Sequence, residues 1–159
     1  MAIERVRAYL AAYGLENEIQ ELAVSSATVA LAAEALGVEG ARIAKTLSFK
    51  KGEGCLLVVA AGDAKIDNHN FKTEFGVKAS MPAGDEVERL VGHAIGGVCP
   101  FGVNEGVQVY LDVSLKRFET VFPACGSSNS AIEMTPDKLF ECAQAKKWVD
   151  VCKAWREEN

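Results

Sequence analysis

The sequence predicts an α+β fold in which helices pack outside one mixed, curved β-sheet. Three observations support this: a helical apolar pattern over residues 3–13, a hairpin pattern over residues 42–61, and strict alternation over residues 107–113. A helix and a strand come first, then a hairpin, a helix and several more strands before the closing helices, an order that favours α+β. The 159 residues are enough for one hydrophobic core, so we expect residues 1–159 to form a single domain.

The first elements follow from periodicity and from helix-ending residues. Residues 3–13 form an amphipathic helix with its apolar side chains three and four positions apart. Residues 18–22 are expected to be extended. Ser25 or Ser26 is expected to cap a second helix, and Gly37 to end it.

A hairpin is the clearest β signal. The strand over residues 42–50 turns through residues 51–54 into residues 55–61, which are apolar on both faces as in a central strand. Asp67 then caps a short helix that ends at Gly76. His69 lies early in that helix, among polar neighbours, and is expected to be exposed.

The second half predicts further strands and two closing helical stretches. Residues 77–81 and 131–134 are expected to be short strands, and Asp85 to cap a helix that ends at Gly92. Residues 107–113 are expected to form a half-buried strand, with Asp112 exposed or bonded to a loop. A helix begins at Thr135 and Pro136, and a separate apolar stripe lies at Trp148, Val151, Cys152 and Trp155.

Composition limits the function classes. Hydrophobic residues make up 49% of the chain, which excludes disorder, and no apolar run is long enough to span a bilayer. The first residues show no signal sequence, so we expect a cytoplasmic protein without a membrane partner. The five cysteines contain no C-x-x-C pair, and there are only two histidines. These counts argue against a disulfide framework and against a metal site.

The net charge of −5 is unusual for a protein that binds nucleic acid. The charge is uneven, however, because residues 45–78 hold six lysines and four acidic residues. A modest positive patch is therefore expected around this segment. Overall acidity predicts weak binding of RNA by the protein alone, so a synthetase or another carrier is a candidate partner.

The stretch from Gly92 to Gly102 is the strongest candidate for a functional loop. It holds four of the fourteen glycines in eleven residues, between a predicted helix and a predicted strand. Glycine permits positive φ and close approach of a ligand, so such a loop can direct several N–H groups at one carbonyl or carboxylate oxygen. A glycine-rich connection without a ligand is the alternative. Lys45 is the second candidate, because alternation puts its charge on the more apolar face of its strand, either at a pocket or extended to solvent.

Lys45 on an early strand and the G-x-x-x-P loop from Gly96 to Pro100 together resemble the YbaK family, whose domains are related to the editing insertion of bacterial prolyl-tRNA synthetases. The resemblance extends over nearly the whole chain. It implies a free-standing deacylase, without a cofactor, that hydrolyses the ester at the acceptor end of mischarged tRNA, with Cys- or Ala-tRNA(Pro) as plausible substrates. It also implies that Lys45 and the backbone of Gly96, Gly97, Val98 and Cys99 act in catalysis. Candidate substrate contacts are Lys45, His93, Pro100, Phe101, Gly126 and Ser127.

Ester hydrolysis requires a stabilised oxyanion, a positioned water and a route for a proton. Loop amides satisfy the first requirement, but the sequence shows no G-x-S-x-G elbow and no evident general base. We therefore expect the free ribose hydroxyl beside the ester to help activate water. His93 either packs at the helix end or bonds to substrate.

Two other hypotheses remain open. One is a non-catalytic module that binds an aminoacyl or nucleotide ligand, or that regulates a synthetase. The other is a thiol enzyme with Cys99 as its nucleophile, which predicts inactivation by alkylation and by Cys99→Ser. The acid–base groups alone do not decide between these and the deacylase.

Overall fold

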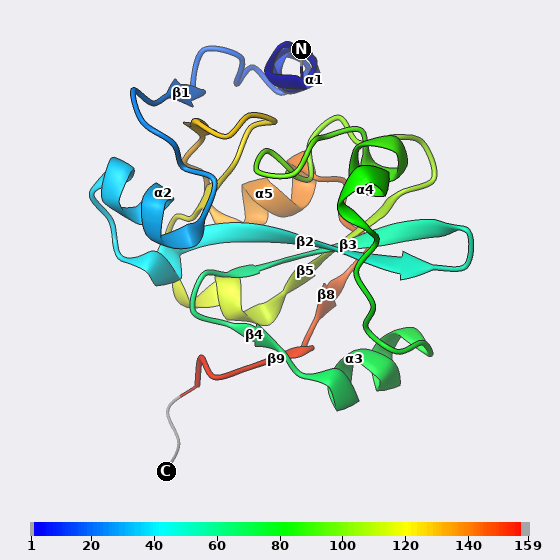
Figure 1. Ribbon diagram of the computed structural model, residues 1–159. Coiled ribbons are helices and arrows are strands. Elements are labelled where there is room, and N and C mark those ends of the chain that lie inside the picture. Colours follow the sequence, from blue (N-terminus) through cyan, green and yellow to red (C-terminus); the bar gives the residue numbers. More distant parts are fainter. Residues whose placement is uncertain (1, 157–159) are drawn as a thin grey trace.

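A five-stranded mixed sheet forms the centre of the computed structural model, which describes residues 2–156 (Figure 1). The strand order is β6-β2-β3-β5-β8. The β2–β3 hairpin is antiparallel, whereas β6, β5 and β8 run parallel to their neighbours, as the predicted mixed sheet requires. The strands are β2 (Ile43–Lys51), β3 (Gly54–Ala61), β5 (Gln108–Asp112), β6 (Phe122–Pro123) and β8 (Trp148–Val149).

Two smaller antiparallel pairs attach the chain's ends to this sheet. Near the N-terminus β1 (Gln20–Glu21) pairs with β7 (Ser130–Ala131). Near the C-terminus β9 (Cys152–Lys153) pairs with β4 (Lys65–Ile66). Segments far apart in sequence are thereby held together on both sides of the sheet.

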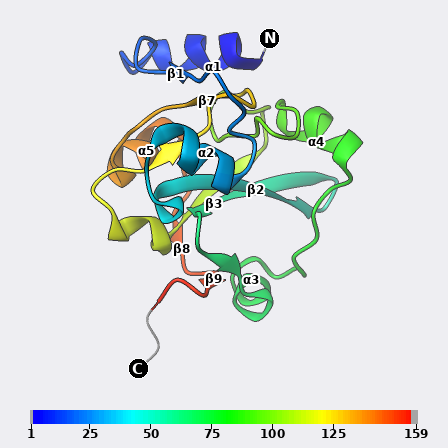
Figure 2. The same cartoon turned by 60° about the vertical axis from the view of Figure 1, so that its left-hand side comes forward.

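Helices cover both faces of the sheet. In Figures 1 and 2, α3 lies below it, whereas α1, α4 and α5 lie above it. The connection from α3 to α4 climbs from one face to the other. The helices are α1 (Ala2–Ala11), α2 (Val29–Leu36), α3 (Asn68–Phe75), α4 (Gly84–Val91) and α5 (Pro136–Cys142), with 3₁₀ turns at Gly40–Arg42 and Val113–Arg117. No helix among residues 2–156 is both long enough and apolar enough to cross a membrane.

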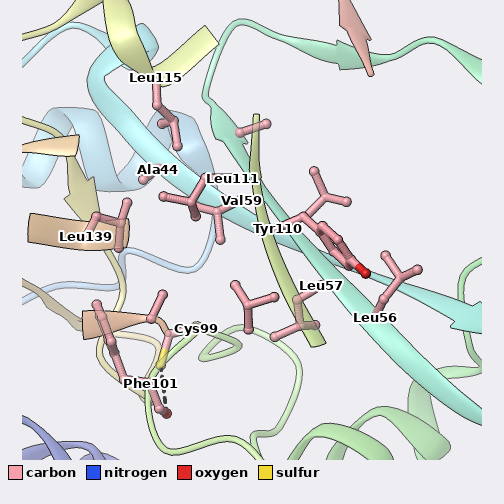
Figure 3. Close-up of a cluster of buried hydrophobic side chains, with 14 of the residues drawn as sticks. Ala44, Leu56, Leu57, Val59, Cys99, Phe101, Tyr110, Leu111, Leu115 and Leu139 are labelled. Atoms are coloured by element: carbon pink, nitrogen blue, oxygen red, sulfur yellow. Dashed lines mark hydrogen bonds between the residues drawn. The ribbon is translucent and has the colours of Figure 1, made fainter. Parts of the chain in front are cut away.

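Strand β2 separates the two faces by simple alternation. Phe49 packs against Phe71 of α3, with ring centroids 4.7 Å apart. Successive side chains of a strand point to opposite faces, so Lys45 shares the α3 face with Phe49, and Thr46 and Ser48 lie on the other face. The core between the sheet and the upper helices contains Leu57, Val59, Cys99, Phe101, Leu111 and Leu139 (Figure 3).

Several predicted caps are confirmed and others are wrong. The Asp67 and Thr135 side chains cap α3 and α5, and Gly37 and Gly76 end their helices in the left-handed conformation. For α2, however, the cap is Thr28 rather than Ser25 or Ser26: the Leu31 N–H donates to Thr28 Oγ1 over 3.2 Å. Ala83 precedes α4 and provides no side-chain cap, so Asp85 lies inside the first turn.

Residues 77–81 form no strand; they are the extended connection that carries the chain past the end of β2. The Lys50 N–H donates to Ser80 O over 2.7 Å, which is a single contact rather than a ladder.

The apolar stripe from Trp148 to Trp155 is not helical: Trp148 lies in β8 and Cys152 in β9, and Val151 and Trp155 lie outside both strands. Asp112 accounts for this: it is fully buried at the end of β5, and its Oδ1 accepts a hydrogen bond from the Val151 N–H over 2.9 Å. Its Oδ2 accepts from the Ser114 N–H over 3.0 Å. The loop-bonding expectation for Asp112 is therefore confirmed and the exposed one is wrong. Strand β5 is buried on both faces, not half-buried.

Candidate active site

A cavity of about 470 Å³ lies beside the part of β2 that has no strand next to it. Pairing with β6 stops at Ala44, so the edge of β2 beyond that residue faces the cavity instead of a strand. The start of α2, the connection before α4 and the 95–98 loop enclose the remaining sides. Most of the wall is apolar, and it includes Val29, Ile43, Leu47, Val87, Val98 and Phe122.

Two main-chain N–H groups of the G-x-x-x-P loop, from residues at the cavity wall, have no acceptor within the described protein. Gly96 and Val98 line the cavity, and their N–H groups donate to no acceptor within residues 2–156. The Gly97 N–H is different, because it donates to Ala94 O over 3.0 Å. Gly96 and Val98, rather than Gly97, are therefore the donors available for an oxyanion.

Glycine at position 97 lets the loop pack against the turn that follows β6. A Cβ atom on Gly97 would lie 2.7 Å from both the carbonyl carbon and the oxygen of Gly126. Gly126 itself has φ +92° and lies against the first turn of α1. The same turn holds the start of α2, since the Ser26 N–H donates to Ser128 O over 2.6 Å. The turn at residues 126–130 thus fixes two walls of the cavity.

Two hydroxyl side chains of β2 lie at the cavity without protein partners. Thr46 Oγ1 is buried and has no hydrogen-bond partner among the described residues. Ser48 lines the same cavity, is 6% exposed, and makes no side-chain hydrogen bond within residues 2–156. A buried hydroxyl without a partner is costly, so Thr46 is an unusual residue to find there unless a ligand bonds to it.

Lys45 lines the cavity, but its ammonium group is bonded elsewhere. Nζ donates to Gly62 O over 3.3 Å and also to Ala64 O. Both carbonyls belong to the turn between β3 and β4, on the α3 face of the sheet. Burial lowers the pKa of Lys45 below its usual range, and the nearby Cys152 and Asp63 oppose that shift. In the structure these two carbonyls, and not a group of the 92–102 loop, accept hydrogen bonds from the Lys45 ammonium group.

His93 and Cys99 form a buried pair inside the loop, away from the cavity. The imidazole is 0% exposed, and its Nε2 lies 2.7 Å from Phe101 O. A carbonyl oxygen only accepts, so the ring donates from Nε2, and Nδ1 has no partner among the described residues. Burial lowers the pKa of His93. Cys99 Sγ lies 3.6 Å from the same Nε2 (Figure 3 shows its bond to Phe101 O), and burial raises the pKa of this thiol to about 12.

The sequence model of the aminoacyl-tRNA editing domain matches residues 24–142, which include every wall of the cavity. The chain belongs to the aminoacyl-tRNA editing domain family. The resemblance drawn from Lys45 and the G-x-x-x-P loop is thereby confirmed.

Relatives of this editing domain support the assignment over the full length. The uncharacterized protein YwhH of Bacillus subtilis is 55% identical over 156 residues, covering 98% of this chain and 99% of that protein. A protein of Enterococcus faecalis described as a candidate Cys-tRNA(Pro)/Cys-tRNA(Cys) deacylase is 27% identical, covering 68% of this chain and 67% of its own length. The crystal structure of a candidate trans-editing enzyme for prolyl-tRNA synthetase superposes with a TM-score of 0.86 at 30% identity, covering 96% of this chain and 97% of that one.

The editing domain brings only part of the predicted site together. Lys45, Gly96 and Val98 line the cavity. Gly97, Gly126 and Ser127 lie behind its wall, where Ser127 Oγ donates to Ser130 Oγ over 2.7 Å. The side chains of His93, Cys99, Pro100 and Phe101 are buried and do not line the cavity, so direct substrate contacts by His93, Pro100 and Phe101 are not what the structure shows.

Sequence reasoning missed the hydroxyl groups. Thr46 and Ser48 occupy alternate positions of β2, on the face opposite Lys45, and Ser130 reaches the cavity from β7. A signal was present: two hydroxyl residues share one face of a strand whose partner strand is wholly apolar. Among residues 2–156, no three His, Cys, Asp or Glu side chains gather as a set that could hold a metal ion.

Proposed function

We propose that this protein is a trans-editing deacylase that hydrolyses the aminoacyl ester of mischarged tRNA, with Cys- or Ala-tRNA(Pro) as its substrates. Membership of the editing family supports the reaction class. The descriptions of the Enterococcus faecalis protein and of the candidate trans-editing enzyme favour tRNA(Pro). The observation that carries the proposal is the pair of unbonded N–H groups of Gly96 and Val98 at the wall of an apolar cavity.

These N–H groups are suited to the charge that develops during ester hydrolysis. Water attacks the ester carbonyl carbon, and the carbonyl oxygen becomes an oxyanion that the two amides bind. The bond between that carbon and the ribose oxygen then breaks. The ribose oxygen leaves as a hydroxyl after it takes up a proton that the attacking water lost, and the amino acid leaves as the free acid. One such donor typically contributes about 3 kcal/mol to the barrier reduction.

The substrate itself supplies the group that activates water in this proposal. Lys45 is the one titratable side chain among the residues that line the cavity, and carbonyl oxygens hold its ammonium group. The ribose hydroxyl beside the ester lies close enough to the reacting centre, by covalent geometry, to relay the proton. A 2′-deoxy substrate charged at the 3′ position should therefore be cleaved at least about 100-fold more slowly, in the range of general acid–base effects. Cleavage at the full rate would refute the relay.

Thr46 and Ser48 complete the site by binding the polar part of the aminoacyl group. A hydroxyl donates one hydrogen bond and accepts others, so it can bind an α-amino group or an ester oxygen. The apolar wall leaves the amino-acid side chain among Val87, Val98 and Phe122. Such a wall accommodates a small, weakly polar side chain such as that of alanine or cysteine, and one methylene changes the preference by only about 10- to 200-fold.

The deciding experiment measures release of labelled amino acid from tRNA(Pro) charged with alanine, cysteine, serine, threonine or proline. Wild-type protein is expected to release alanine or cysteine and to spare proline. Thr46→Val should lower kcat/KM about tenfold, the effect of losing about 1.4 kcal/mol of hydrogen bonding. Its unfolding free energy should not fall, because the hydroxyl bonds to nothing else in the described protein.

Thr46→Ser is the matched control, because it keeps the hydroxyl and removes only a methyl group. It should retain most of the activity that Thr46→Val loses. Equal activity of wild type and Thr46→Val would exclude the proposed role of this hydroxyl. Failure of wild-type protein to release any of the five amino acids would exclude the deacylase.

A non-catalytic binding module is the second candidate, favoured by the absence of a general base among the lining residues. It predicts that charged tRNA binds more tightly than uncharged tRNA while its ester survives. Measuring binding and release on the same charged tRNA separates the two functions.

A further inference from the structure

We propose that Met81 and Ile95 form an apolar surface at the cavity mouth, here called the base shelf, on which the adenine of the terminal nucleotide stacks while its aminoacyl ester occupies the cavity. This inference rests on the proposed function, because the adenine belongs to the nucleoside that carries the ester. It assigns side chains to the nucleoside, which the loop amides and the hydroxyls of β2 do not contact in that proposal.

The base shelf consists of apolar side chains that the protein leaves in water. Within residues 2–156, four large apolar side chains are exposed: Val24, Leu31, Met81 and Ile95. Of these, only Met81 and Ile95 line the cavity, and they are 58% and 67% exposed. Single exposed apolar side chains are common on protein surfaces, but two on the rim of one cavity form a patch that a ligand can cover.

Close packing brings the two parts of the base shelf to the same side of the mouth. A Cβ atom on Gly84 would lie 2.9 Å from Ile95 Cδ1, so the end of the isoleucine side chain lies against the first residue of α4. Met81 is three residues before Gly84, in the connection that rises from α3 to α4 (Figure 1). That connection is attached to β2 beside Met81, because the Lys50 N–H donates to Ser80 O over 2.7 Å.

The exposed lining residues mark where a nucleoside leaves the cavity. They are Ala27, Thr28, Met81, Gly84 and Ile95. The other lining residues are half-buried or buried. On the α2 side the loop comes close to Ala27, since a Cβ atom on Gly96 would lie 3.7 Å from Ala27 Cβ. A stacked base does not fit between them, so the base shelf is the side of the mouth that can receive it.

Covalent geometry brings the base to this side. In the proposed reaction the ester carbonyl binds the N–H groups of Gly96 and Val98, and the amino-acid side chain points to the inner wall. The ester oxygen belongs to the ribose, and the base is attached to the same sugar ring. Ile95 directly precedes Gly96, so their Cα atoms are about 3.8 Å apart. A base one sugar ring away from the ester is therefore within reach of the base shelf.

The chemistry of the base shelf fits the face of a base rather than its edge. The side chains of Met81 and Ile95 have no N–H or O–H donor. Apolar side chains bind nucleobases by stacking on their faces, and stacking tolerates any base. Mature tRNAs share the same terminal adenosine, so a stacking surface without a base-specific contact is sufficient. The base shelf contributes affinity for the nucleoside, and the amino acid is selected deeper in the cavity.

The test compares two alanyl esters that differ only in the base. One is 3′-O-alanyl-adenosine, and the other is the 3′-O-alanyl ester of methyl β-D-ribofuranoside, which has a methoxy group in place of adenine. Both keep the ribose hydroxyl beside the ester. The base preference is the ratio of kcat/KM for the first ester to kcat/KM for the second. The wild type should show a base preference of about tenfold, within the range that stacking of one base contributes.

Three double variants are measured beside the wild type. Met81→Ala with Ile95→Ala should reduce the base preference to about twofold or less. Met81→Leu with Ile95→Leu preserves apolar surface and should retain most of the preference. The control is Val24→Ala with Leu31→Ala, which removes the two exposed apolar side chains that do not line the cavity and should keep the wild-type preference. Circular dichroism and thermal melts establish that the variants fold.

Several outcomes would overturn the base shelf. One is a wild type that hydrolyses the two esters equally well, and another is an alanine pair that keeps the full preference. An equal loss of preference in the leucine pair or in the control would also contradict it. If the alanine pair slowed both esters by the same factor, its side chains would act on the aminoacyl group or on the fold, and not on the base.

Binding of uncleavable analogues separates this inference from the proposed reaction. Calorimetry with alanine amide-linked to 3′-amino-3′-deoxyadenosine, and with its base-free counterpart, gives the base preference as a ratio of Kd values. Wild-type protein that prefers the adenosine analogue through Met81 and Ile95 but cleaves no ester would reject the deacylase and retain the base shelf. Wild-type protein that cleaves both esters equally would retain the deacylase and reject the base shelf.

Discussion

Two pairs of polar side chains near the 92–102 loop differ in what they can reach. The core pair, His93 and Cys99, is 0% exposed and bonds to Phe101 O. The cavity pair, Thr46 and Ser48, lines the cavity and has no side-chain partner in residues 2–156. The residue types with the greater intrinsic reactivity are therefore used for packing, whereas the hydroxyls of the cavity-lining residues have no partner within the described protein.

The physical cause of this difference is the path of the loop. His93 and Cys99 are fully buried, and burial lowers the pKa of the imidazole and raises that of the thiol; Figure 3 shows Cys99 within the core. Between them in the sequence, Gly96 and Val98 bring their backbone to the cavity instead. Residue chemistry alone is a poor guide to a site of this kind, because main-chain amides act regardless of the side chain they carry.

Gly97→Ala should have the largest effect, because it forces apart the two turns that hold the loop. The added Cβ would lie 2.7 Å from the Gly126 carbonyl, a backbone group that cannot rotate away. We expect a loss of about 2–3 kcal/mol in unfolding free energy, measured by urea denaturation. Gly54→Ala is the matched control, because the nearest atom to its Cβ lies 3.9 Å away. Equal stability of the two variants would show that the loop does not depend on this close approach.

Cys99→Ser should affect stability and leave the rate unchanged. A serine hydroxyl in this fully buried position is harder to satisfy than a thiol, so we expect a cost of about 1–2 kcal/mol. The deacylation rate per folded molecule should stay within twofold of the wild type, and iodoacetamide should not inactivate the native protein. Loss of activity at unchanged stability would instead favour the thiol enzyme.

Acid should lower the unfolding free energy through His93, by less than either of these two substitutions does. Burial lowers the pKa of His93, so the unfolded chain takes up its proton at a higher pH than the folded protein does. The stabilisation by neutral His93 is complete above the unfolded value of about 6.5 and is lost as pH falls toward the folded pKa. Its slope cannot exceed about 1.4 kcal/mol per pH unit. The urea midpoint of the wild type should fall between pH 7.5 and pH 5, and that of His93→Asn should fall less. If the two midpoints fall equally with pH, His93 is not the cause of the loss of stability.

Much of the fold was predictable because its elements have strong local signals. The β2–β3 hairpin combines two strand patterns with a glycine-rich turn, and the glycines at positions 37 and 76 end their helices as expected. The region from Trp148 to Lys153 was not predictable in the same way. Its apolar spacing fits a helix, but pairing with β5 and β4 and the buried carboxylate of Asp112 impose extended structure.

The site was predictable only as far as glycine and charge reveal it. Gly96 and Val98 were selected because glycines mark an exposed backbone, and Lys45 because a charge stood on an apolar face; all three line the cavity, and their roles stay predictions. Periodicity predicts the face on which a side chain starts but not where its far end lies. The hydrogen bonds from the Lys45 ammonium group to Gly62 O and Ala64 O could therefore not be predicted from the sequence. The Thr46 hydroxyl is of interest because no group among the described residues forms a hydrogen bond with it, and only the folded structure reveals that.

The most direct test of the site is an amide NMR titration with alanine linked to 3′-amino-3′-deoxyadenosine through an amide bond that cannot be cleaved like the ester. The N–H signals of Gly96 and Val98 should move downfield as they bond to the ligand carbonyl, whereas that of Gly97, already bonded to Ala94 O, should change little. Signals of Gly96 and Val98 that stay in place at saturating ligand would show that these amides do not form the oxyanion site.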